Sequence, residues 1–168
     1  LVFHAPTRGL MGYTSRFLTL TKGTGVINRI FHGYGKFEGE MDGRKNGALI
    51  SMATGKAVAF AIFNLQARGE MFVTHNDPVY EGMIVGLAPK PGDMIINVMK
   101  GKQLTNMRTQ GTDENVVLTP VRQMSIAEQL SMLNTDEALE ITPKSLRLRK
   151  AILNPNDRKK NEKSGTPL

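Results

Sequence analysis

The 168-residue chain contains no cysteine and no tryptophan. Without cysteine, disulfide bonds and thiolate metal sites are excluded. No apolar run approaches the roughly 18–20 residues that span a bilayer, so no transmembrane helix is predicted. Seven Phe and three Tyr make up only 6% of the residues. So few aromatic rings argue against a surface that stacks single-stranded bases, and favour recognition of RNA by shape and backbone.

Catalytic motifs are also missing. The sequence has no GxxxxGK[ST] phosphate loop, no HExxH and no GxSxG, so it lacks the standard signatures of nucleotide, zinc and serine hydrolase sites. The three histidines, His4, His32 and His75, lie far apart. We therefore predict no catalytic residue, no metal site and no enzymatic activity for this chain.

What the chain does have is positive charge at its two ends. The net charge is +7; residues 1–37 carry five Arg or Lys and no acid, and residues 144–168 carry eight basic and two acidic residues. Basic surfaces of this kind suit a polyanion such as RNA, because counterion release supplies affinity. Two alternatives stay open: basic ends that only solubilise the chain, or a module that grips an acidic protein.

The first part of the chain has the pattern of a β–α–β unit. Residues 1–4 and 24–33 are apolar enough for strands, and Pro6 opens a helical stretch that Gly23 ends near Lys22. Glycines and acids at residues 37–43 indicate a domain boundary. The start at Leu1, without Met or a leader pattern, is typical of the cut end of a longer protein.

The remainder has short apolar runs separated by turns, which predict a mostly β, barrel-like domain of the α+β class. Ser125 and Glu128 match a capping box that begins a helix over residues 126–133. Asn154 and Pro155 begin a short terminal helix. Residues 63–68 are expected to form a helical turn. The expected strands are residues 48–52 and 56–62, joined as a hairpin, then 70–73, 82–87, 94–99, 116–121, 138–142 and 145–150.

The last of these strands is a candidate RNA-binding surface. Leu146 and Leu148 alternate with Arg147 and Arg149, so the two guanidinium groups share the outer face about 6.6 Å apart. Guanidinium groups suit bidentate phosphate binding. The basic surface is extended by Lys150, Arg158, Lys159, Lys160 and Lys163.

Residues 100–115 form the strongest functional candidate. The segment is polar, contains two glycines and lies between two apolar runs. A loop this long inside a compact domain is usually either functional or disordered. Its cations, amides and hydroxyls are donors for phosphate and sugar oxygens. Its cations are Lys100, Lys102 and Arg108.

Several motifs resemble a known family. Residues 8–23 resemble a helix in the fifth domain of elongation factor G and its relatives. A more specific resemblance is to the C-terminal region of the BipA/TypA translational GTPases. Six segments of this chain carry it, in the same order: residues 46–51, 55–60, 65–69, 79–86, 104–108 and 111–114.

This resemblance implies an organisation and a function. Residues 1–37 would be the latter half of a ferredoxin-like domain, and residues 44–168 the C-terminal domain peculiar to the family. The chain would bind large-subunit rRNA and reach the acceptor end of A-site tRNA through the 100–115 segment. By motif position, the resemblance places these contacts at Lys100, Lys102, Thr105, Asn106, Arg108 and Thr112. In the family, GTP and Mg²⁺ bind elsewhere in the intact protein, and the chain would hold no cofactor.

The resemblance also implies a cytoplasmic, ribosome-associated protein that serves ribosome assembly, stress adaptation and growth at low temperature. A ferredoxin-like sheet needs both of its halves. We therefore expect residues 1–4 and 24–33 to leave an open sheet edge, which either pairs with another chain or becomes disordered.

Overall fold

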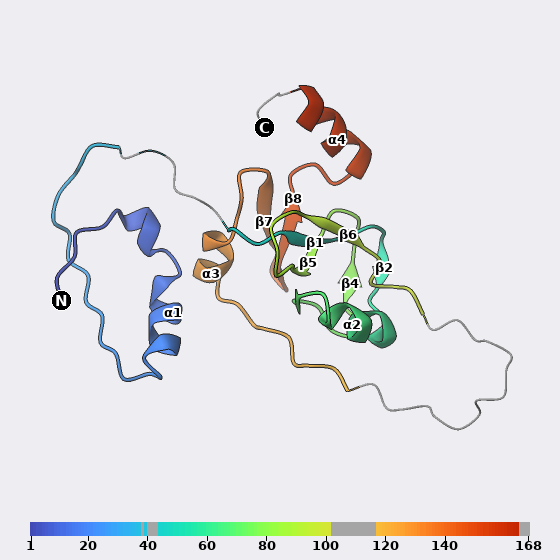
Figure 1. The fold of residues 1–168 in the computed structure, drawn as a ribbon, viewed down its shortest axis with the longest axis horizontal. Coiled ribbons are helices and arrows are strands. Elements are labelled where there is room, and N and C mark those ends of the chain that lie inside the picture. The colour runs from blue at the N-terminus through green and yellow to red at the C-terminus, as the bar shows by residue number, and fades with distance from the viewer. Residues whose placement is uncertain (38, 40–43, 102–116, 165–168) are drawn as a thin grey trace, which may run out of the picture.

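The computed structural model describes residues 1–37, 39, 44–101 and 117–164 (Figure 1). Short helices and strands are mixed along the chain, so the predicted α+β class is confirmed. The helices are the 3-10 helix η1 (Thr7–Leu10), α1 (Tyr13–Leu20), α2 (Ala59–Gln66), α3 (Ile126–Ser131) and α4 (Pro155–Ser164). The strands are β1 (Ala48–Ser51), β2 (Gly55–Lys56), β3 (Glu70–Met71), β4 (Pro78–Val79), β5 (Ile84–Leu87), β6 (Met94–Ile96), β7 (Glu137–Ile141) and β8 (Leu146–Lys150).

A four-stranded sheet in the order β3-β5-β1-β6 forms the centre of the fold. Strand β1 runs antiparallel to β5 and parallel to β6. Two smaller antiparallel sheets, β2-β4 and β7-β8, flank it. In the described part of the chain these sheets are open, so the barrel-like sequence pattern corresponds to separate small sheets. No helix in this part is long and apolar enough to span a membrane.

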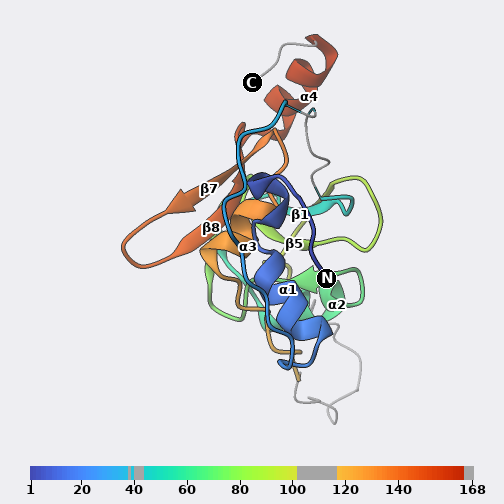
Figure 2. The ribbon, with the colours of Figure 1, turned by 90° about the vertical axis from the view of Figure 1, so that its left-hand side faces the viewer.

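Both faces of the central sheet are buried, which explains why β1 is apolar at consecutive positions. Leu49 packs in one core cluster with Ile62 and Leu65 of α2. Its neighbour Ile50 packs in a second cluster with Ile84 and with Leu148 of β8. Successive strand residues point to opposite faces, so α2 covers one face of the sheet and the β7-β8 hairpin covers the other. Figure 2 shows this hairpin projecting from the sheet.

The expected hairpin at residues 48–62 is wrong. Strand β2 pairs with β4 rather than with β1, and most of residues 56–62 belong to helix α2. Ala61, Ile62 and Leu65 are the buried residues of α2. Leu65 follows Ile62 by three residues and Ala61 by four, which is the spacing of one face of a helix packed on a core. The periodicity of a short apolar run does not distinguish a strand from a buried helix. Here the run forms a helix that packs on Leu49 of the central sheet.

The N-terminal unit keeps its helix but lacks both predicted strands. Residues 1–4 and 24–33 form no strand, and no strand of the described chain pairs with them. Their side chains are left in solvent: Val26 is 83% exposed, Ile30 94% and Phe31 75%. An isolated β–α–β half has no sheet to complete it, which accounts for the missing strands. Figure 1 shows this unit in blue, next to α3, which lies between it and the sheet.

Local chemistry predicted the C-terminal part well. The capping box at the start of α3 is present: the Glu128 backbone N–H donates to Ser125 Oγ (3.3 Å), and the Ser125 N–H donates to the Glu128 carboxylate (2.9 Å). These bonds hold the pKa of Glu128 below its usual value. The β7-β8 hairpin and α4 also form as expected. The described residues of the expected strand at 116–121 form no strand.

Candidate nucleic-acid interface

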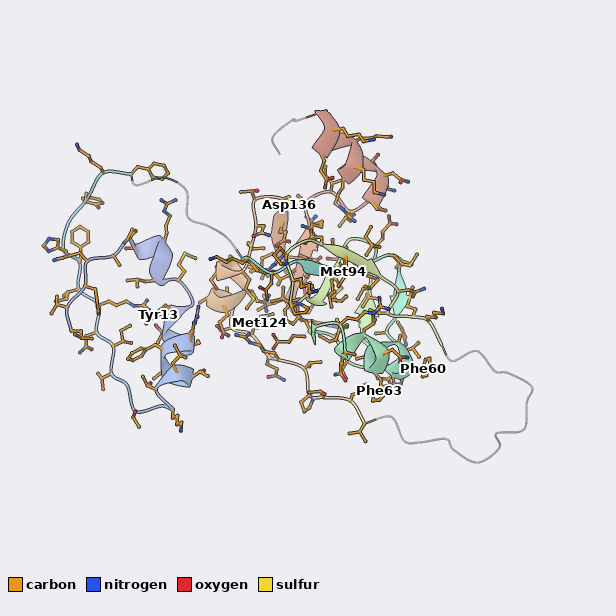
Figure 3. The ribbon with its side chains drawn as sticks, in the orientation of Figure 1. Tyr13, Phe60, Phe63, Met94, Met124 and Asp136 are labelled. Atoms are coloured by element: carbon orange, nitrogen blue, oxygen red, sulfur yellow. The ribbon has the colours of Figure 1, made fainter. Side chains whose placement is uncertain are left out.

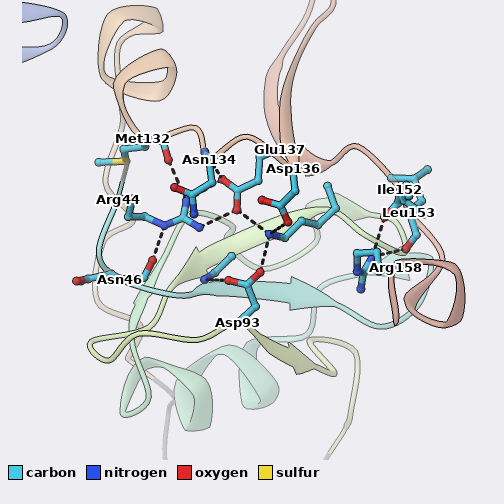
Figure 4. A network of polar contacts seen from close by, with 12 residues as sticks. Arg44, Asn46, Asp93, Met132, Asn134, Asp136, Glu137, Ile152, Leu153 and Arg158 are labelled. Atoms are coloured by element: carbon cyan, nitrogen blue, oxygen red, sulfur yellow. Dashed lines mark hydrogen bonds and ion pairs between the residues drawn. The ribbon is translucent and has the colours of Figure 1, made fainter. Parts of the chain in front are cut away.

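A cluster of charged side chains surrounds Lys150, the last residue of β8 (Figure 4). The side chains of Lys150, Arg44 and Glu137 are buried, and those of Asp93 and Asp136 are partly exposed. The side-chain ammonium group lies 2.5 Å from Asp93, 2.6 Å from Asp136 and 3.0 Å from Glu137. Arg44 grips the same Glu137 carboxylate with two bonds of 3.0 and 2.7 Å. We call these five residues the lysine cluster. It ties β7 and β8 to the segment that enters β1 and to the turn that enters β6.

Lys150 is therefore not part of an exposed basic face, and its prediction as an RNA-binding residue is wrong. The residue is 1% exposed. The strand alternation that turns Arg147 and Arg149 outward turns Lys150 inward, on the same side as Leu148. Desolvation inside the protein lowers the pKa of Lys150. The hydrogen bonds that the ammonium group donates to Asp136, Asp93 and Glu137 outweigh that effect, so the pKa of Lys150 lies above its ordinary value.

Arg147 and Arg149 do share the outer face of β8, but both have partners within the protein. Arg147 donates to Glu140 on the neighbouring strand at 3.3 Å. Arg149 donates to the backbone oxygens of Lys150 and Ala151 at 3.2 and 3.4 Å. A surface ion pair of this kind is weak, so Arg147 can exchange Glu140 for a phosphate at small cost.

On α4, the predicted basic residues divide into one structural arginine and several exposed lysines. Arg158 donates to the backbone oxygens of Ile152 and Leu153 at 2.9 and 2.6 Å, and so holds the turn between β8 and α4. Lys160 forms only a 3.5 Å pair with Asp157, and its side chain is 79% exposed. Lys159 and Lys163 are exposed, and no ion pair involves them in the described part of the chain. We call Lys159, Lys160 and Lys163 the α4 lysines.

A second basic site includes Lys100, the first residue of the 100–115 segment. Lys100 is exposed and lines a groove of about 380 Å³ between α2 and β6, together with Arg68, Asn64 and Asn97. Phe63, on the same helix, is 50% exposed (Figure 3). We call the groove residues Arg68, Lys100, Asn64 and Asn97 the basic groove. Lys102, Thr105, Asn106, Arg108 and Thr112 lie outside the described residues.

The structure does not bring the two basic sites together. Both ribbon views show α4 at one end of the folded region and α2 at the opposite end (Figures 1 and 2). Sequence reasoning does not find Arg68 and Asn64, because it predicts a strand over residues 56–62. A helix through residue 68 would have placed Phe60, Asn64 and Arg68 at i, i+4 and i+8, on one face.

No cluster of three or more His, Asp or Glu side chains in the described chain is placed to hold a metal ion. The three carboxylates of the lysine cluster converge on the Lys150 ammonium group. The described surface thus offers charged groups that can bind anions through hydrogen bonds and Coulomb attraction. It offers no arrangement that resembles an acid–base pair for catalysis.

Comparison with known proteins identifies the family. A family model described as the TypA/BipA C-terminal domain matches residues 46–155. A protein named Large ribosomal subunit assembly factor BipA from Buchnera aphidicola subsp. Schizaphis graminum is 47% identical over 163 residues, which are 96% of this chain and 27% of that protein. Proteins of the same name from Salmonella typhimurium and Haemophilus influenzae are 47% and 42% identical, over 92% and 99% of this chain and 26% and 27% of their own lengths.

The chain thus spans about a quarter of the length of these curated relatives. Their similarity confirms the resemblance seen in the sequence motifs. Because the family model covers residues 46–155, well over half of the chain, this chain belongs to the TypA/BipA C-terminal domain family.

Proposed function

We propose that this chain is a non-catalytic, RNA-contacting region of a large ribosomal subunit assembly factor. The observation that carries the proposal is the pair of exposed basic sites, the α4 lysines and the basic groove, in a chain whose relatives are named as assembly factors of that subunit. Two separated cationic sites suit a large folded RNA, because each can neutralise phosphates on a different part of its surface.

The finer proposal concerns the partners. We place large-subunit rRNA at the α4 lysines, at Arg147 and at the basic groove. The acceptor end of A-site tRNA is assigned to the 100–115 segment, which begins at the basic groove and carries Lys102, Thr105, Asn106, Arg108 and Thr112. The amides and hydroxyls of that segment suit sugar and base oxygens better than lysine alone would.

The proposed place of action is the cytoplasm, on ribosomes, in assembly linked to stress and low temperature. GTP and Mg²⁺ are assigned to the part of the relatives that this chain does not cover, since the chain has no GxxxxGK[ST] loop. The rival reading, a module that grips an acidic protein through the basic ends, has less support, because Lys150, Arg149 and Arg158 are occupied by partners inside the protein.

Charge reversal of the α4 lysines tests the rRNA proposal. A chain with Lys159→Glu, Lys160→Glu and Lys163→Glu is expected to bind large ribosomal subunits about 10²-fold more weakly near 0.1 M salt. The slope of log K against log salt should fall by about 2 to 3, since each lost phosphate contact removes about 0.7 to 0.9. Co-sedimentation and filter binding across a salt series measure both quantities.

The matched control reverses three exposed lysines elsewhere, with Lys45→Glu, Lys56→Glu and Lys90→Glu. It changes the net charge by the same amount and should reduce affinity far less. Equal losses in the two triple variants would mean that only net charge matters, and no loss in the α4 variant would refute the proposal. A basic-groove variant, Arg68→Glu with Lys100→Glu, tests the second site in the same assay.

Self-association is proposed for the N-terminal unit, because four large apolar or aromatic side chains within residues 26–34 are exposed: Val26, Ile30, Phe31 and Tyr34. Exposed apolar surface of this kind marks an interaction site. Sedimentation velocity of the chain should show dimers or larger species at micromolar concentration, and Ile30→Lys with Phe31→Lys should return it to a monomer. A monomer at all concentrations in the unmodified chain would rule this out.

A further inference from the structure

A cleft of about 680 Å³ lies on the face of the fold away from α2. It is bounded by the β7-β8 turn, by residues 121–124 that lead into α3, and by the start of β5. Its apolar lining comes from Phe72, Met83, Ile84, Met124 and Leu148. Most of these residues belong to the second core cluster, so the cleft opens directly onto the hydrophobic core. Of the proposed RNA contacts, Arg147 lies on the rim of this cleft, and the α4 lysines and the basic groove do not line it.

Gln129 of α3 lines this cleft and carries an acceptor without a donor. The residue is 8% exposed, and its side-chain N–H donates to the Met124 backbone oxygen at 3.3 Å. That bond fixes the other side-chain atom, Oε1, as a buried oxygen with no hydrogen-bond partner in the described part of the chain. Buried polar atoms are nearly always paired in folded proteins, so this oxygen calls for a donor supplied from the cleft.

The edge of β8 that lines the cleft also lacks a partner strand. One edge of β8 pairs with β7 along its whole length, from Leu146 to Lys150. The other edge joins the central sheet only at the isolated bridge between Met83 and Arg149 and at the Lys150 bond to Gly82. Toward Leu146, no described strand pairs with this edge. An unpaired edge beside an apolar cleft is the arrangement to which extended peptides add as a strand.

The rim of the cleft is positive. Arg122, Lys144 and Arg147 line it, and no Asp or Glu does. Arg122 has weak pairs with Glu70 and Glu128 at 3.7 and 3.4 Å, and Arg147 pairs with Glu140 at 3.3 Å. Lys144 is exposed and has no ion pair within the described residues. Charge complementarity therefore favours an acidic occupant whose carboxylate reaches Lys144.

From these four features we infer that the cleft binds an extended, acidic peptide segment of a partner protein. The segment adds to the free edge of β8 near Leu146 and places an apolar side chain against Phe72 and Met83. One of its N–H groups donates to Gln129, and a carboxylate pairs with Lys144. An RNA base fits this cleft less well, because Phe72 is the one aromatic ring among the lining residues of the described chain and stacking needs aromatic faces.

Backbone amide NMR of the full 168-residue chain tests the inference with defined probes. The first probe is a pool of blocked heptapeptides with a central Leu, Ile, Phe or Met and with Asp or Glu on both sides. The second pool has Lys in place of the acids, the third is the acidic pool with N-methylated backbone amides, and the fourth probe is single-stranded RNA heptamers. The acidic pool is expected to shift the amide signals of Leu146, Leu148 and Phe72, and the other probes should leave them unchanged.

Two cleft variants and a control provide the second measurement. Lys144→Glu and Gln129→Leu should each weaken binding of the best acidic peptide by about five- to tenfold, in line with the loss of one charge pair or one buried hydrogen bond. Lys90→Glu, an exposed charge reversal away from the cleft lining, should leave it unchanged. No shift with any peptide pool, equal binding of the lysine pool, shifts caused by RNA alone, or unchanged affinity in both cleft variants would each overturn the proposal.

Discussion

Replacing Lys150 by Met is expected to lower the free energy of unfolding by about 3–5 kcal/mol, the cost of removing one partner from a buried charge cluster. The Glu137 side chain is fully buried and shares its charge with Lys150 and Arg44. Without the lysine, Asp93 and Asp136 lose their nearest cation as well. Met fills much of the same volume, so the loss reports the charge and not a cavity. Urea unfolding followed by circular dichroism measures the change.

The loss of unfolding free energy in Lys150→Met should depend on pH, because the pKa values of Asp93 and Lys150 are shifted in the folded state. Burial raises the pKa of Asp93, but the Ala48 N–H and Lys150 outweigh burial and hold the pKa below its ordinary value of 3.8. A lowered carboxyl pKa stabilises the fold above pH 3.8, and this contribution is lost as the pH falls through the folded-state pKa. Because the pKa of Lys150 is raised in the folded state, this lysine stabilises the fold below pH 10.5, and its contribution is lost as the pH rises through the folded-state pKa. The difference between Lys150→Met and the unmodified chain should therefore be constant from about pH 5 to 9 and shrink on either side.

Lys160→Met is the matched control, because it removes a lysine whose side chain is 79% exposed and whose one ion pair is 3.5 Å long. Its effect on the unfolding free energy should stay within about 0.5 kcal/mol. If Lys150→Met were equally mild, the carboxylates around it would have to be neutral or hydrated, and the description of the cluster as a buried ionic link would be wrong.

Local chemistry explains which elements the sequence could predict. The capping box of α3, the alternation in β8 and the Asn-Pro start of α4 depend on neighbouring residues, so each can be recognised without the rest of the fold. The strand expected at residues 56–62 failed because the choice between strand and helix depended on Leu49 and Val85, which α2 has to cover. The strands expected at residues 1–4 and 24–33 failed because strands need partners, and no strand among the described residues pairs with these segments.

The candidate site divides in the same way. The exposed lysines of α4 could be predicted from composition, since a short polar helix has little to bury them. The assignment of Lys150 to the outer, RNA-binding face was wrong, although strand alternation places it on the same face as Leu146 and Leu148. An inward lysine requires carboxylates, and Asp93 and Asp136 reach it only through tertiary contacts. Arg68 and Asn64 became visible as a site only once α2 was known. The 100–115 segment remains a prediction, with its residues from 102 onward outside the described chain.

Gly47→Ala should destabilise the fold by about 3 kcal/mol, the upper end of what overpacking costs. The methyl group would overlap the carbonyl group of Gly92. No side-chain rotation can relieve this overlap, because the backbone of Gly47 is fixed on both sides: its N–H donates to Lys90 at 2.9 Å, and its carbonyl accepts from Ala88 at 2.8 Å. The strand entrance and the 89–93 turn would have to separate.

Moving the 89–93 turn away from the strand entrance would also displace Asp93, which directly follows Gly92 and belongs to the lysine cluster. One oxygen of Asp93 accepts from the Ala48 N–H at 2.7 Å, and the other lies 2.5 Å from Lys150. The double variant Gly47→Ala with Lys150→Met should therefore lose less stability than the sum of the two single variants, since both act through Asp93. Gly35→Ala, where no atom lies within 4 Å of the added carbon, is the neutral control. Strictly additive losses in urea unfolding would show that the 89–93 turn and the lysine cluster are independent.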